Sequence, residues 1–109
     1  PGMIISNEPG FYLEGEFGIR IENRIVVREA SPVPGGDRDM LSFETITLAP
    51  IDRRLIAPGL LSPTERAWLD CYHMRVFGTL SGWPGLSAPE RRWLAEACRP
   101  IHSKLNHLS

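Results

Sequence analysis

The chain has 109 residues, of which 42% are apolar, and its 12 basic and 13 acidic side chains give a net charge of −1. This length suits one ordinary domain with its own core, and the composition does not indicate disorder. The balanced charge, the absence of any Lys/Arg cluster longer than a pair and the short apolar runs argue against nucleic acid and membranes as partners.

The first 16 residues predict two extended segments and a turn. The apolar run at residues 3–6 predicts a short buried strand that Pro9 and Gly10 stop, and residues 11–13 are extended again. Residues 14–16 (Glu-Gly-Glu) predict a three-residue hairpin turn, because Gly15 can adopt a positive φ. With Gly15 at the centre, residues whose numbers sum to 30 face each other, which places Glu8 opposite Glu22.

Residues 17–28 alternate with a period of two, which predicts the returning strand. One face is apolar and is expected to be core: Phe17, Ile19, Ile21, Ile25 and Val27. The other face is polar: Gly18, Arg20, Glu22, Arg24 and Arg28. Residues 30–39 predict a loop, and residues 41–48 predict a further strand that ends at Pro50.

Two capping boxes predict two helices in the second half of the chain, at Ser62-Pro63-Thr64-Glu65 and at Ser87-Ala88-Pro89-Glu90. Gly78 or Gly82 can end the first helix, and Pro100 is expected to break the second. Both helices carry apolar residues at helical spacing: Trp68, Leu69, Tyr72, Val76 and Leu80 in the first, and Trp93, Leu94 and Ala97 in the second. The fold class is therefore α+β, with antiparallel strands followed by an antiparallel helix pair.

The opposed carboxylates of Glu8 and Glu22 are the main chemical signal in the sequence. Like charges directly across a strand pair are destabilising, so a cation between them is one explanation. The other is a solvated polar face in which Arg20 neutralises the carboxylates. Two carboxylates do not complete the coordination shell of a hard divalent cation, so further ligands would have to come from elsewhere.

Two motifs resemble the C-terminal catalytic signature of the pita-bread metallopeptidases, specifically the Xaa-Pro aminopeptidases (aminopeptidase P). They are Asn-Glu-Pro-Gly-Phe-Tyr at residues 7–12 and Phe-Gly-Ile-Arg-Ile-Glu-Asn at residues 17–23. Residues 41–51, 61–62 and 68–73 are similar to the long, cytosolic-type branch of that family, which has a C-terminal extension. The resemblance implies that residues 1–50 are the last strands of a pita-bread catalytic domain and that residues 51–109 are a two-helix extension.

The resemblance also implies a dinuclear metal site, usually manganese, held by two aspartates, one histidine and two glutamates. Glu8 and Glu22 match the two glutamate ligands, and Arg20 matches an arginine that orients a metal-binding carboxylate, so Glu8 and Arg20 are the candidate catalytic residues. The implied substrates are peptides with proline at the second position. The implied enzyme is cytoplasmic and a homodimer.

The ligand set departs from the family because both aspartates and the ligand histidine precede this stretch there, whereas only seven residues precede Glu8 here. His73 lies in a predicted helix, and His102 and His107 lie in a polar tail, so they are expected to be packing or surface residues. We therefore expect the chain to be the C-terminal part of a longer enzyme and, by itself, to hold no cofactor and be inactive. The alternatives are a non-catalytic pita-bread binding module and a dimerisation element.

Two further expectations concern the helices. Cys71 and Cys98 are isolated in the sequence, so reduced thiols are expected. Trp68, Tyr72 and Trp93 could line a substrate pocket, but aromatic residues on amphipathic helices are more often core, and core is the prediction.

Overall fold

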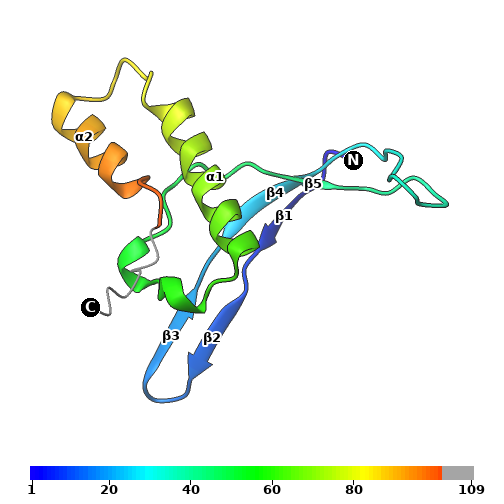
Figure 1. Ribbon diagram of the computed structural model, residues 1–109, viewed down its shortest axis with the longest axis horizontal. Helices are drawn as coiled ribbons and strands as arrows, with labels where there is room; N and C mark the ends of the chain where they lie inside the picture. The colour runs from blue at the N-terminus through cyan, green and yellow to red at the C-terminus, as the bar shows by residue number, and fades with distance from the viewer. Residues whose placement is uncertain (102–109) are drawn as a thin grey trace, which may run out of the picture. The chain divides into compact units, whose positions relative to one another are not determined.

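The computed structural model describes residues 1–101 and divides the chain into two compact units, Pro1–Thr47 and a second unit that begins at Leu48 (Figure 1). The first unit contains the strands and the second contains the helices. This order confirms the predicted α+β class of antiparallel strands followed by two helices.

The first unit is built on a long two-stranded ribbon (Figure 1). Strand β1 (Ile4–Asn7) pairs antiparallel with β4 (Asn23–Val27), and β2 (Gly10–Leu13) pairs antiparallel with β3 (Phe17–Arg20). In both ladders the paired residue numbers sum to 30, as in Ile5 with Ile25 and Phe11 with Ile19. The turn at its tip has Gly15 at φ 75°, so the predicted hairpin and its register are confirmed.

The returning strand differs from prediction because it is interrupted between β3 and β4, at Ile21 and Glu22. Pro9 lies at the corresponding level of the opposite strand, and proline has no N–H to donate to the ladder. Only one backbone bond forms at that level, from the Ile21 N–H to the Pro9 carbonyl, at 3.2 Å. The missing donor therefore splits one predicted strand into two.

The third strand of the main sheet is β5 (Phe43–Thr45), which is shorter than the predicted 41–48. It pairs antiparallel with β4, so the strand order is β1-β4-β5. Residues 30–39 form the expected loop, which is closed by an isolated pairing between Ser31 and Met40.

The prediction that the apolar strand faces are core is wrong for most of the ribbon. Every residue of β1, β2 and β3 is exposed, and Phe17 keeps 51% of its surface open to solvent. Of the predicted apolar face, only Ile25 is buried. Burial needs a covering layer, and residues 1–47, which the structure describes in full, contain no helix.

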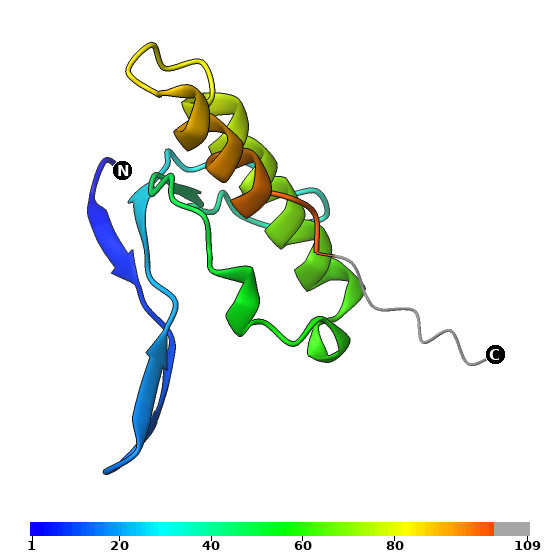
Figure 2. The same cartoon turned by 90° about the vertical axis from the view of Figure 1, so that its left-hand side faces the viewer.

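The second unit consists of two short 3₁₀ turns, at Arg53–Leu55 and Pro58–Leu60, followed by helices α1 (Pro63–Leu80) and α2 (Ala88–Ala97). Both capping boxes form as predicted: the N-cap hydroxyls of Ser62 and Ser87 accept from the backbone N–H three residues on, and the glutamate there accepts in return. Helix α1 passes through Gly78 and ends before Gly82. Figures 1 and 2 show α2 running back alongside α1.

The core of the second unit lies between the two helices. Tyr72 and Val76 of α1 contact Leu94 of α2 and Cys98, and Leu48 and Ile51 pack against this cluster from the segment before the helices. Cys71 and Cys98 are both free thiols, as expected. None of the helices in residues 1–101 combines the length and apolar character needed to cross a lipid bilayer.

Candidate functional site

The ribbon brings Glu8 and Glu22 to the same level of its two strands. On one side of them along the ribbon is the Asn7–Asn23 pair, and on the other is the backbone hydrogen bond from Ile21 to Pro9. Asn23, next to Glu22, is buried, while Glu8 and Glu22 are exposed. The register that sequence reasoning used to oppose the two carboxylates is therefore present on both sides of them.

Arg20 lies on the same face and forms an ion pair with Glu22, with the Nη2 and Oε2 atoms 3.2 Å apart. The pKa of Arg20 is raised above its usual value, mainly by the charge of Glu22, then by Tyr12, and also by Glu8. The guanidinium therefore interacts with both carboxylates, and the pair with Glu22 is the strongest of these interactions.

Tyr12 is the residue of this face that sequence reasoning missed. Its ring lies over Gly18, directly across the ribbon, and over Gly10: a β-carbon at Gly18 would stand 2.7 Å from Cδ1 of Tyr12, and one at Gly10 would stand 2.7 Å from the hydroxyl. The phenol also contributes to raising the pKa of Arg20, after the charge of Glu22. An aromatic residue opposite a glycine in the predicted register is the signal that could have found it.

The polar face of the ribbon therefore has a defined layout. Glu8, Gly10 and Tyr12 on one strand lie at the levels of Glu22, Arg20 and Gly18 on the other. The two glycines leave room for the tyrosine ring, and Tyr12 and Glu22 both interact with Arg20. Both side chains of the Arg20–Glu22 pair remain partly open to solvent.

The donor chemistry of this face fits part of a site for a hard divalent cation. Glu8 and Glu22 offer carboxylate oxygens, which Mg²⁺, Ca²⁺ and Mn²⁺ prefer. Across residues 1–101, no three His, Cys, Asp or Glu side chains come together as a possible metal-binding group. The ribbon thus carries two candidate ligands, and the described residues do not place a third beside them.

The histidines lie elsewhere in the chain. His73 is on α1, fully buried, and its Nε2 accepts a hydrogen bond from the Ile51 N–H at 3.0 Å, so it is a packing residue. Burial, and then the charge of Arg53, hold the pKa of His73 below its usual value. His102 and His107 lie outside the described residues.

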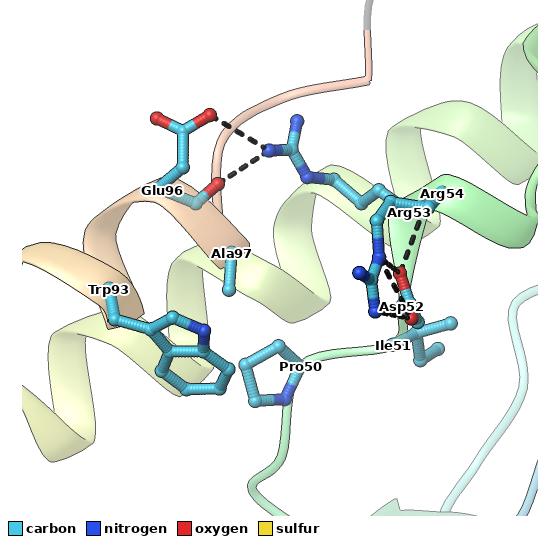
Figure 3. Close-up of a pocket in the computed structure, with 8 residues that line it drawn as sticks. All are labelled: Pro50, Ile51, Asp52, Arg53, Arg54, Trp93, Glu96 and Ala97. Carbon is cyan, nitrogen blue, oxygen red and sulfur yellow. Dashed lines mark hydrogen bonds and ion pairs between the residues drawn. The ribbon is translucent and has the colours of Figure 1, made fainter. Parts of the chain in front are cut away.

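A cavity of about 390 Å³ lies in the second unit, between the segment before the helices and α2 (Figure 3). Its lining residues are Pro50, Ile51, Asp52, Arg53, Arg54, Trp93, Glu96 and Ala97. The aromatic prediction holds for Tyr72, which is core, and is wrong for Trp68 and Trp93, which are 51% and 65% exposed. Trp93 instead forms a wall of this cavity, next to Pro50 (Figure 3).

Comparison with protein families gives two adjacent matches. Residues 39–101 match the C-terminal region of peptidase M24, and residues 1–29 match metallopeptidase family M24. The first match alone covers more than half of the chain.

Individual proteins give the same result. The chain is 45% identical over 102 residues to a probable Xaa-Pro aminopeptidase P of Tuber melanosporum and 44% identical to one of Aspergillus oryzae, covering 93% of this chain in each case. The crystal structure of an X-prolyl aminopeptidase from Caenorhabditis elegans, described as a cytosolic enzyme with a dinuclear active site, superposes with a TM-score of 0.76 at 38% identity over 90% of this chain. The chain spans 16% of the length of each of these relatives.

Proposed function

Because the chain belongs to the M24 metallopeptidase family, whose C-terminal region matches residues 39–101, we propose that it contributes two glutamate ligands to the dinuclear metal site of an Xaa-Pro aminopeptidase. Glu8 and Glu22 are the proposed ligands. The observation that carries the proposal is the opposition of these two carboxylates across the ribbon, with Arg20 paired to Glu22.

The proposed role of each residue on this face follows from its contacts. Glu8 is exposed and forms no ion pair within residues 1–101, so its carboxylate faces solvent and is available to a cation and to substrate. Arg20 is a positioning residue, because it acts on Glu22 and does not itself supply an oxygen ligand. Tyr12 contributes to raising the pKa of Arg20, and its ring lies over Gly10 and Gly18 on the same face.

Two bound divalent ions would supply Lewis acidity, which polarises the scissile carbonyl and makes water a better nucleophile near neutral pH. The contribution of this chain is to hold two oxygen ligands at fixed positions on a hydrogen-bonded ribbon. The proposed substrates are peptides with proline at the second position, in line with the names of the relatives. Manganese is the proposed metal, since it suits carboxylate ligands.

The domain boundaries, the location and the oligomeric state are also proposed. Residues 1–50 are assigned to the end of the catalytic domain and residues 51–109 to a helical extension. A cytoplasmic location is supported by the cytosolic relative from Caenorhabditis elegans. A homodimer is also proposed; the exposed apolar side chains of β1 to β3 favour association with a covering surface, either from a second copy or from the rest of a longer chain.

The test is a chimera in which this chain replaces the corresponding segment of the Caenorhabditis elegans enzyme. We expect manganese-dependent cleavage of an Xaa-Pro peptide and two bound ions per subunit. Glu8→Gln and Glu22→Gln should each lower metal occupancy and reduce activity by at least about 100-fold, since even residues outside the ligand shell affect affinity 10- to 100-fold. Glu29→Gln, an exposed glutamate of the same unit, is the matched control.

Two results would overturn the proposal. One is a folded chimera in which both glutamine variants keep full metal occupancy and activity. The other is efficient turnover by the 109-residue chain alone with manganese, because two ligands should not support the reaction.

A further inference from the structure

His73 is a buried histidine that the proposed metal site does not use. It lies on α1 with none of its surface exposed, and its Nε2 atom accepts the backbone N–H of Ile51 at 3.0 Å. Its other ring nitrogen, Nδ1, is buried and has no hydrogen-bond partner within the described part of the chain. A buried polar atom without a partner is uncommon and calls for an explanation.

The hydrogen bond to Ile51 sets the protonation state of the ring. A nitrogen that accepts a backbone N–H carries no proton, so the neutral ring must be protonated on Nδ1. Adding a second proton, on Nε2, would set two N–H donors against each other and place a cation in the core. The bond therefore exists only with neutral His73.

The hydrogen bond between His73 and Ile51 holds in place the segment that forms one wall of the cavity. Ile51 is one of the five lining residues that precede the helices, and Trp93 of α2 lies next to Pro50 (Figure 3). The same segment is also held by the Tyr72 hydroxyl, which donates to the Ala49 carbonyl at 2.9 Å, and by Arg53, which donates to the Glu96 carbonyl. Burial raises the pKa of Tyr72 above its usual 10, so its bond does not respond to acid, whereas the bond that His73 accepts does.

We propose that His73 is an acid-sensitive latch: neutral, it holds residues 50–54 against α1 and closes one side of the cavity, and protonated, it releases Ile51 and lets this segment move away from Trp93. The charged neighbours act in opposite directions. Arg53, from the 3₁₀ turn, disfavours the imidazolium, whereas Asp70 on α1 favours it. Arg53 is paired with Glu96 of α2, and Asp70 accepts a hydrogen bond from the Ile101 N–H. These contacts weaken the influence of both charges on His73.

The direction of the pH effect follows from linkage. Burial lowers the pKa of His73 in the closed state below the usual 6.5, so the open state binds the proton more tightly. The latch contributes fully above pH 6.5 and is lost as the pH falls through the lowered pKa. Between these two values, uptake of one proton on opening changes the ratio of closed to open molecules about tenfold per pH unit.

The experiment is a titration by nuclear magnetic resonance of the full 109-residue chain, from pH 8 to pH 4. His102→Gln and His107→Gln are included so that His73 is the only imidazole among the three of the sequence. We expect a ring protonated on Nδ1 at pH 8. The His73 ring, the Ile51 amide and the Trp93 indole should then change together with one midpoint below pH 6.5, while the amides of β2 and β3 should not share this transition.

The control is His73→Gln, whose side-chain carbonyl can still accept the Ile51 N–H but does not titrate. Ile51 and Trp93 should then show no transition between pH 8 and 5. The proposal is overturned by a neutral ring protonated on Nε2, by titration of His73 without a change at Ile51, or by the same transition in His73→Gln. If His73→Gln does not fold, the ring tautomer and the joint titration of His73, Ile51 and Trp93 still test the proposal.

Discussion

Arg20 and Glu22 are joined by an ion pair of 3.2 Å on the polar face of the ribbon, and both side chains remain partly open to water. An exposed pair of this kind adds little to folding stability, because water screens the two charges. Its value lies in orientation, because the planar guanidinium holds a carboxylate in one direction. The pair therefore fits a role in placing Glu22 better than a role in holding the sheet together.

Replacing Arg20 by lysine should test that role. Lysine keeps the charge but loses the planar fork, so the chimeric enzyme should bind manganese about 10- to 100-fold more weakly while its melting temperature changes little. Metal titration by calorimetry measures the effect, and Arg92→Lys on the exposed side of α2 is the control. Unchanged affinity in Arg20→Lys would remove Arg20 from the proposed site.

Gly18→Ala should displace Tyr12. The added β-carbon would stand 2.7 Å from the ring, so the phenol must swing away, which changes its interaction with Arg20. The upfield ring-current shift expected for the Gly18 α-protons in the parent chain reports the stacking, and the Arg20 side-chain signals should broaden in the variant. Gly59→Ala, where a β-carbon meets nothing within 4 Å, should leave both signals as they are.

Val76→Ala should destabilise the second unit by roughly 2–3 kcal/mol, because two buried methyl groups are lost and a cavity remains. Val76 has no exposed surface and lies in the core cluster with Tyr72 and Leu94. Urea unfolding followed by helical circular dichroism measures the change. Met74→Ala, at a position that is 66% exposed on the same helix, should change stability by less than about 0.5 kcal/mol.

The capping glutamates should make helix stability depend on pH. Hydrogen bonds from Ser62 lower the pKa of Glu65, and those from Ser87 lower the pKa of Glu90, below the usual 4.5. A lowered pKa means that the charged form stabilises the fold, so this contribution is present above pH 4.5 and is lost as the pH falls through the lowered value.

Glu65→Gln and Glu90→Gln keep an acceptor for the N-cap but remove the titration. The double variant should therefore lose less helical circular dichroism than the parent chain between pH 5 and 3. Glu29→Gln, in the first unit, should behave like the parent. An unchanged acid profile in the double variant would contradict this explanation.

Local chemistry made several features predictable from the sequence. Gly15 between two acidic residues specified the turn, and the turn specified the register that opposes Glu8 and Glu22. Ser62 and Ser87 with their glutamates marked both helix starts to the residue. Each of these depends on residues within a few positions of one another, and a single chain carries that information.

Other features could not be predicted from short stretches of the sequence. Alternation in residues 17–28 identified a strand with one apolar face, but burial depends on what covers that face, and most of it is exposed. The break at Ile21 came from Pro9, twelve positions away in sequence, acting through the ladder. The position of the Tyr12 ring depends on Gly10 and Gly18, which lie on different strands and come together only in the paired register.

The sequence by itself thus determined where the strands turn, where the helices begin and which carboxylates face each other, because turns, caps and register are set by short-range backbone preferences. Only the tertiary structure decided that Arg20 joins Tyr12 to Glu22, that Trp93 lines a cavity, and that His73 is buried against the Ile51 amide. These depend on contacts between residues distant in the chain, whose energies arise from packing and desolvation that no local pattern contains.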